Sequence, residues 1–195
     1  MSDLASHGGW SDVINALVSG NDISRAAAGA ALSEILLGDA TPAQIAGFIV
    51  ALRAKGESID ELDGMLSVAM AEAKIVPLTD DERSISIDVV GTGGDGSNSV
   101  NVSTMAALVA AAAGAPVCKH GNRSASSKTG AADVLETLGV AIEQTPEGVA
   151  ACVRQAGIGF CLAPSFHPAF RYAGAPRREM GVPTVFNLLG PMANP

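Results

Sequence analysis

Residues 91–104 carry a high density of groups that could bind an anion. The segment reads GTGGDGSNSVNVST and contains four glycines, an aspartate, two asparagines and five hydroxyls. It stands between the apolar, β-rich run SISIDVV and the alanine-rich run MAALVAAAAG. Exposed backbone N–H groups in a glycine-rich turn that leads into a helix bind phosphate through fixed dipoles. We therefore predict an anion site here. The alternative is a tight turn in which Asn101 or Ser103 caps the helix.

Three side chains of this segment could add oxygen atoms to such a site. Asp95, among the glycines, could orient a hydroxyl of the ligand or reach a metal-bound water. Ser103 and Thr104, where the helix is expected to begin, could supply hard oxygen ligands to magnesium. The segment has neither the GxGxxG pattern nor the Gly-Lys-Ser/Thr phosphate loop, so it does not favour a dinucleotide or nucleoside triphosphate site.

A second segment, KHGNRSASSKTGAADVLETLG at residues 119–139, repeats this organisation: a short strand, a polar loop and a helix. Lys119 offers a point charge, Arg123 a planar fork, and Ser126 and Ser127 offer hydroxyls. The alternative, a solvated basic loop, does not explain why these polar residues surround Gly121. Ligands gather at the carboxyl ends of parallel strands, so two such loops predict a substrate with two phosphate groups, or with a phosphate and a diphosphate.

The helices and strands that must position these loops can be predicted from the spacing of apolar residues and from helix-capping residues. The first third reads as four helices in a small bundle, with apolar residues three and four apart. Ser11, Ser24 and Thr41 are predicted to cap the first three helices, and Pro42 occupies the first position of the third. The fourth, SIDELDGMLSVAMAEA, ends before Pro77. None of these helices carries a recognisable catalytic pattern.

From residue 84 onward, short β-rich runs alternate with helical stretches. The predicted strands are SISIDVV, PVCK, VAI and IGFCLA, and the predicted helices cover 102–114, 131–139 and 145–157. This alternation is typical of parallel strands joined by crossover helices. We therefore expect an α/β fold with a small N-terminal helical domain at 1–78. An α/β domain with a mainly parallel central sheet follows at 79–195. The chain stops on Asn-Pro after an apolar segment, from which we expect this domain to be incomplete at its C-terminus.

The composition narrows the class of protein further. A net charge of −8 argues against general binding to nucleic acid or to anionic membranes. No apolar stretch reaches the ~20 residues that span a bilayer, and the start lacks the pattern of a signal peptide, so we expect a cytoplasmic protein. The three cysteines form no CxxC pair and are interpreted as small buried apolar residues. The scattered histidines belong to no recognisable nucleophilic triad.

Three segments together resemble the signature segments of the anthranilate phosphoribosyltransferases, a family of tryptophan-biosynthesis enzymes. They are GTGGDGSNSVNVST, KHGNRSASSKTGAADVLETLG and GVPTVFNLLGPMANP, in this order. The helical first third also resembles the small domain of that family. Pyrimidine nucleoside phosphorylases are similar in architecture but carry neither KHGNR nor the FNLLGP segment.

The resemblance implies a role for particular residues. In the first segment, those implied to hold the donor, 5-phosphoribosyl 1-diphosphate, are Gly91, Gly94, Asp95, Ser99, Asn101, Val102, Ser103 and Thr104. In the second they are Lys119, His120, Gly121, Asn122, Arg123, Ser124, Ala125, Ser126, Ser127 and Ala131. Ser103 is also implied to be a magnesium ligand. Asn122 and Arg177 match positions that hold anthranilate, and His120 and Pro191 match the lining of its path.

The implied reaction transfers the phosphoribosyl group of the donor to the amine of anthranilate, with Mg2+ as cofactor and no covalent nucleophile. The resemblance also implies a homodimer formed through the helical domain. It places an acidic pair of magnesium ligands beyond residue 195, so that this chain could bind substrate without turning it over. Two alternatives stay open: an enzyme similar to the nucleoside phosphorylases, and a non-catalytic module for binding or dimerisation.

Overall fold

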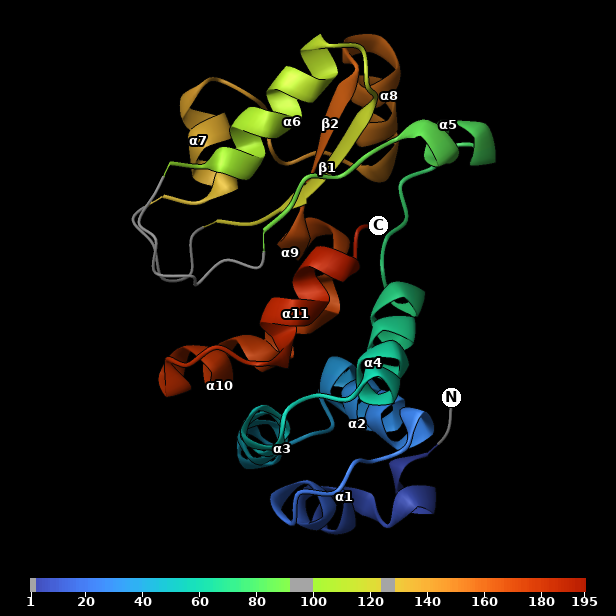
Figure 1. The fold of residues 1–195 in the computed structure, drawn as a ribbon, viewed down its shortest axis with the longest axis vertical. Helices are drawn as coiled ribbons and strands as arrows, with labels where there is room; N and C mark the ends of the chain where they lie inside the picture. Colours follow the sequence, from blue (N-terminus) through green and yellow to red (C-terminus); the bar gives the residue numbers. More distant parts are fainter. Residues whose placement is uncertain (1–2, 92–99, 124–128) are drawn as a thin grey trace. The chain divides into compact units, whose positions relative to one another are not determined.

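The computed structural model describes residues 3–91, 100–123 and 129–195 (Figure 1). The chain divides into two compact units. The first comprises Met1–Glu72 and Ala169–Ala193, and the second comprises Ala73–Pro168 and Asn194–Pro195. We had expected one division, between residues 78 and 79. In the structure, Ala169–Ala193 belongs with the first helices because Val185, Phe186 and Leu189 are buried in their apolar core.

The first unit is helical throughout its described part. Its elements are η1 (Leu4–His7), α1 (Gly9–Val18), α2 (Arg25–Leu37), α3 (Pro42–Lys55), α4 (Ile59–Ala71), α10 (Arg171–Met180) and α11 (Val185–Met192). The predicted caps Ser24 and Thr41 accept backbone hydrogen bonds at the starts of α2 and α3. The predicted cap Ser11 is wrong: α1 already begins at Gly9, because Gly8 takes the left-handed conformation at the N-cap position.

Glycines allow two helices of this unit to approach closely. A Cβ atom on Gly64 in α4 would lie 2.1 Å from the carbonyl oxygen of Arg25, the first residue of α2. Gly29 of α2 faces the Gly64 carbonyl in turn, where a Cβ atom would lie at 3.1 Å. Side chains on these two residues would force the helices apart, so the absence of a side chain is what sets the α2–α4 contact.

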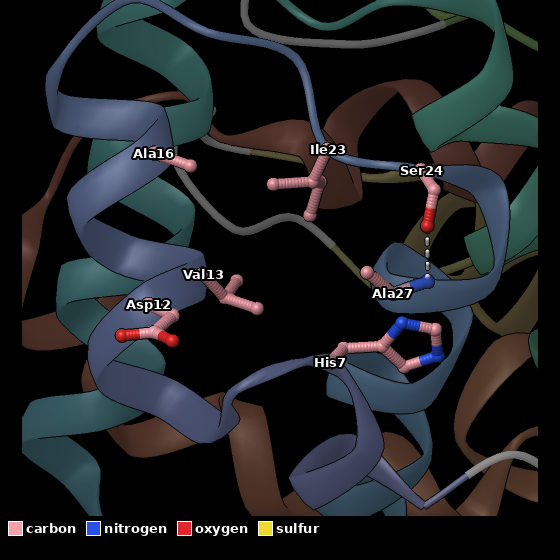
Figure 2. A pocket seen from close by; sticks show the side chains of 7 residues that line it. All are labelled: His7, Asp12, Val13, Ala16, Ile23, Ser24 and Ala27. Atoms are coloured by element: carbon pink, nitrogen blue, oxygen red, sulfur yellow. Dashed lines mark hydrogen bonds between the residues drawn. The ribbon is translucent and has the colours of Figure 1, made fainter.

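An open pocket of ≈ 310 Å³ lies between η1, α1 and the start of α2. Figure 2 shows its lining of small and apolar side chains, with His7 and Asp12 at its edge. Ser24 Oγ accepts the Ala27 N–H at 3.1 Å, which caps α2 beside the pocket. The pocket contains none of the residues that the sequence predicts for a site.

The second unit holds a parallel sheet with helices around it. Its elements are α5 (Asp80–Ile85), α6 (Val102–Ala112), β1 (Val117–Gly121), α7 (Ala131–Thr137), α8 (Pro146–Ala156), β2 (Ile158–Leu162) and α9 (Ala163–Phe166). The short helix η2 (Pro168–Phe170) follows. Strands β1 and β2 pair in parallel with Val117 opposite Ile158 and Gly121 opposite Leu162. The predicted α/β class with a parallel sheet is confirmed.

The two faces of the sheet bury different residues. Cys118 and Cys161 lie on one face in a core with Val149 and Val153 of α8. Their Sγ atoms are 3.7 Å apart, and both thiols are free. Phe160, on the opposite face, packs with residues that include Ala132 and Leu135 of α7. This alternation follows from the two-residue period of a strand.

Two predicted strands did not form as strands. In the run SISIDVV, α5 continues to Ile85, and only Ile87 makes an isolated parallel bridge, to Val117. Thr79 caps α5 and Glu82 returns the bond to the Thr79 N–H, a capping box that favours helix over the β-propensity of the run. Residues 140–142 form neither helix nor strand. Within the described residues, no helix is long and apolar enough to cross a membrane.

Candidate functional site

The N-terminus of α6 has no side-chain cap among the described residues. Asn101 occupies its N-cap position, but the Asn101 side chain accepts no hydrogen bond from the helix. A hydroxyl caps α2, α3, α4, α5 and α8, whereas α1, α9 and α10 resemble α6 in having no side-chain cap bond. The first N–H groups of a helix carry a partial positive charge and need acceptors. Val102 N–H donates to the Val100 carbonyl at 2.7 Å, and the anion site at this end of α6 remains a prediction.

The two hydroxyls predicted as magnesium ligands lie in the first turn of α6. Ser103 is half-buried, and the buried Thr104 Oγ1 has no hydrogen-bond partner among the described residues. Within the same residues, no group of three acidic, histidine or cysteine side chains could hold a metal ion. Mg²⁺ prefers carboxylate and phosphate oxygens, so this neutral pair fits the ion only as part of a complex with a diphosphate. Ser103 would then supply one oxygen.

The carboxyl end of β1 lies at the same end of the unit as the N-termini of α6 and α7 (Figure 1). Lys119 in this strand is buried, with 2% of its surface exposed, and its Nζ donates to the Val89 carbonyl oxygen at 2.6 Å. Burial lowers the pKa of Lys119, while the nearby carboxylate of Asp88 opposes that shift. The predicted phosphate contact of Lys119 remains a prediction, since its ammonium here contacts backbone.

His120, the next residue, lies on the face of β1 opposite to that of Lys119. Its backbone N–H donates to Asp88 Oδ1 at 3.2 Å, and its ring centroid lies 5.3 Å from that of His167. The amide of Asn194 donates to Asp88 Oδ2 at 2.8 Å and to the Cys118 carbonyl oxygen at 2.7 Å. Burial raises the pKa of Asp88, whereas the Asn194 bond and the charge of Lys119 act in the other direction.

The carboxyl end of β1 contacts the start of α7. The Asn122 carbonyl oxygen accepts the Ala132 N–H at 3.2 Å. A Cβ atom on Gly121 would lie 2.9 Å from the Phe160 ring and 3.4 Å from Ala131 Cβ, which explains the glycine here. The predicted site residues Gly121, Asn122 and Ala131 are thus brought together at the junction of β1 and α7.

Arg123 is exposed and already engaged. Its guanidinium pairs with Asp133 at 3.1 Å and with Glu136 at 2.7 Å, both in α7. These partners raise the pKa of Arg123 and lower that of Glu136. A phosphate would have to displace or share these carboxylates, so binding of the ligand by Arg123 remains a prediction.

Arg177 belongs to the helical unit, in α10. The structure half-buries it and places its guanidinium carbon 5.0 Å from the centre of the Phe186 ring in α11. Burial lowers the pKa of Arg177, and no carboxylate of the described residues forms an ion pair with it. A guanidinium with no ion-pair partner among the described residues can pair with the carboxylate of an acid. Phe186 is itself buried, so its ring supports Arg177 rather than a ligand.

Some of the remaining predicted residues lie in the described segments, and the others lie outside them. Gly91 is exposed just after Val90, and Val102 is exposed in the first turn of α6. Pro191 lies within α11 of the helical unit. Seven predicted residues lie outside the described ones: Gly94, Asp95, Ser99, Ser124, Ala125, Ser126 and Ser127.

Sequence reasoning missed two residues of this region. Asp88 and Asn194 are separated by more than a hundred positions, and their bond brings them together at β1. One signal was present in the sequence, because an aspartate inside the apolar run SISIDVV needs polar partners when the run is buried.

Two family models match the chain. Residues 11–73 match the helical bundle domain of a glycosyl transferase family, and residues 83–195 match the α/β domain of a glycosyl transferase family. The second match alone covers more than half of the chain. The chain belongs to this glycosyl transferase family.

Sequence relatives narrow the assignment within this family. The chain is 55% identical over 188 residues to the anthranilate phosphoribosyltransferase of Saccharopolyspora erythraea, covering 96% of this chain and 52% of the relative. It is 57% identical over 186 residues to that of Rhodococcus jostii, covering 95% of this chain and 50% of the relative. The chain therefore spans about half the length of these relatives. The resemblance drawn from the three segments is confirmed.

Solved structures agree with this family assignment. A crystal structure of anthranilate phosphoribosyltransferase from Thermus thermophilus superposes with a TM-score of 0.84 at 42% identity, covering 94% of this chain and 55% of that one. The Saccharomyces cerevisiae enzyme in complex with PRPP and Mg has a TM-score of 0.81 at 30% identity, covering 95% and 55%. The fold described above is thus that of half of these family members.

Proposed function

We propose that the chain is the donor-binding part of an anthranilate phosphoribosyltransferase. The observation that carries this is the uncapped N-terminus of α6, which follows the glycine-rich segment and lies at the same end of the unit as the carboxyl end of β1. The yeast relative that contains PRPP and Mg supports the identity of the ligand. The donor is 5-phosphoribosyl 1-diphosphate, and its diphosphate is the anion that α6 would receive.

In the proposed reaction, the amine nitrogen of anthranilate forms a bond to C1 of the ribose. The bond from C1 to the diphosphate oxygen breaks, the diphosphate leaves with the electron pair, and the amine proton passes to solvent. The amides of α6 would hold the diphosphate in place, and catalysis would come from positioning and from stabilisation of charge. Magnesium, when bound with Ser103 as one ligand, would neutralise charge on the leaving group.

The acceptor would be held by its carboxylate. Arg177 has a guanidinium that no described carboxylate neutralises, and the buried Phe186 ring packs beneath it. The yeast relative in complex with 4-fluoroanthranilate supports an aromatic acid as the second ligand. We further propose that acidic magnesium ligands come from the half of the relatives that this chain does not span, and that the helical unit forms a homodimer in the cytoplasm.

Calorimetric titration with 5-phosphoribosyl 1-diphosphate, with and without magnesium, tests the proposal. We expect saturable binding that the metal strengthens. A folded chain that binds no donor under either condition would contradict it. A nucleoside phosphorylase would instead release a free base from nucleosides in the presence of phosphate, and a dimerisation module would self-associate without binding the donor.

A further inference from the structure

The pairing between β1 and the segment before it ends abruptly at the candidate site. Ile87 N–H donates to the Pro116 carbonyl at 2.9 Å, and Cys118 N–H donates to the Ile87 carbonyl at 3.0 Å. A parallel ladder that continued in this register would next join Val89 N–H to the Cys118 carbonyl and His120 N–H to the Val89 carbonyl. Neither bond forms between these described residues.

Side chains take the place of those backbone partners. The Cys118 carbonyl accepts the Asn194 amide at 2.7 Å, and His120 N–H donates to Asp88 Oδ1 at 3.2 Å. The Val89 carbonyl accepts Lys119 Nζ at 2.6 Å. Three backbone groups of the missing ladder are therefore satisfied by Asp88, Lys119 and Asn194, which we call the polar clamp.

Two members of the clamp, Asp88 and Asn194, also bind each other. A single Asn194 amide nitrogen donates to both Asp88 Oδ2 and the Cys118 carbonyl, so it connects segment 88–91 to β1 across a short gap. The charge of Asp88 opposes the lowering of the Lys119 pKa by burial. A polar group in such a position is costly to leave unpaired, so the arrangement is cooperative.

We propose that Asp88 and Asn194 are positioning residues that, with Lys119, hold segment 88–91 away from the carboxyl end of β1. The separation occurs immediately before Gly91, where the first predicted donor-binding segment begins. If the backbone ladder continued instead, residues 89–91 would pair with β1, and the first donor-binding segment would begin directly beside that strand. The role of the clamp in donor binding rests on the proposed function.

Calorimetry on the full 195-residue chain tests that role, at a temperature where circular dichroism shows each variant folded. Asn194→Asp removes both donated bonds and sets two carboxylates against each other, and Asp88→Asn removes one acceptor and the charge. We expect each to bind 5-phosphoribosyl 1-diphosphate with magnesium about tenfold more weakly than the unmodified chain. The exposed Asn21→Asp in the helical unit is the matched control and should bind as the unmodified chain does.

The double variant Asp88→Asn with Asn194→Asp separates positioning from a general loss of stability. An asparagine at 88 can donate to an aspartate at 194, so the double variant should bind better than the sum of the two single losses predicts. Unchanged affinity in all folded variants, with only a lower unfolding temperature, would overturn the positioning role.

Amide hydrogen exchange tests the clamp without the donor. Asp88→Ala removes the acceptor of the His120 N–H, so this amide should exchange about tenfold or more faster. The Val117 amide, which donates to Gly157 on the β2 side, should keep its rate. Unchanged His120 exchange would overturn the clamp. Absence of donor binding in the unmodified chain would remove the proposed function, and with it the donor-positioning role, while the exchange result would still decide whether the clamp exists.

Discussion

Arg154 and Glu82 form an ion pair with two parallel hydrogen bonds. Arg154 Nε donates to Glu82 Oε1 at 2.6 Å, and Arg154 Nη2 donates to Glu82 Oε2 at 2.8 Å. The same guanidinium nitrogen Nη2 donates to the Pro77 carbonyl at 2.9 Å. The pair connects α8, which covers the sheet, to α5 and to the segment that enters it.

This pair makes stability depend on pH. The bonds from Arg154, with those from Thr79, lower the pKa of Glu82 to about 2. A carboxyl with a lowered pKa contributes stability above its unfolded pKa of about 4.3, and this contribution is lost as pH falls toward the folded value. Glu82→Gln should therefore lower the unfolding temperature at pH 6, and the difference from the unmodified chain should shrink between about pH 4.3 and pH 2. The exposed Glu72→Gln is the control, and a constant difference across that range would contradict the assignment.

Glu61, a buried carboxylate in the helical unit, is expected to contribute more to the unfolding free energy than the more exposed Glu82. Glu61 accepts the N–H groups of Ile23 at 3.0 Å and Ser58 at 2.8 Å, and it pairs with Lys55 at 2.9 Å. Glu61→Gln replaces one accepting carboxylate oxygen with an amide nitrogen that cannot accept, and it removes the charge that pairs with Lys55. We therefore expect a loss of about 3 kcal/mol in unfolding free energy. Denaturant titration measures it. Asp60→Asn, on the exposed side of the same helix turn, should change the free energy by less than about 1 kcal/mol.

The close approach of α2 and α4 is tested by adding one methyl group. Gly64→Ala places a Cβ atom against the backbone carbonyl of Arg25, which a side-chain rotation cannot relieve. We expect a loss of about 2 kcal/mol or more in unfolding free energy. Gly47→Ala in α3 meets only the end of the Ile14 side chain at 3.4 Å and should stabilise the chain slightly. Equal effects at both positions would show that the contact does not depend on Gly64.

A carboxylate introduced at the N-terminus of α6 tests whether this helix end binds the anion. Ser103→Asp puts a carboxylate in the first turn, where it stabilises the helix through the macrodipole but repels a diphosphate. The unfolding temperature should stay equal or rise while calorimetric binding of the donor is lost. Ser11→Asp makes the same change in the first turn of α1 and should leave binding intact. Retained binding by Ser103→Asp would exclude this helix end as the anion site.

The proposed acceptor contact is tested at Arg177. Arg177→Gln keeps much of the length of the side chain but removes its charge, so anthranilate should bind about tenfold or more weakly, while donor binding stays unchanged. Titration with anthranilate in the presence of the donor measures this. Arg178→Gln, its exposed neighbour, is the matched control, and equal losses in both variants would assign the effect to general electrostatics.

The sequence alone determined much of this molecule. Local signals specified two of the capped helices: Ser24 and Thr41 each accept the backbone bond predicted for them. The alternation of apolar runs and helices predicted the parallel pairing of β1 with β2. The anion site inferred from the glycine-rich composition remains a prediction. Each of these signals comes from residues within a few positions of one another, so it can be read directly along the chain.

Tertiary structure decided the rest. Asp88, Lys119 and Asn194 belong to segments far apart in the chain, and only their packing around β1 ends the ladder at Ile87. The placement of Ala169–Ala193 with the first helices likewise depends on burial of Phe186 and Leu189 in a core made by α1 to α4. Hydrophobic burial and hydrogen bonding stabilise contacts between residues at any separation in the sequence. Local propensity could therefore predict neither the end of the ladder nor the placement of Ala169–Ala193.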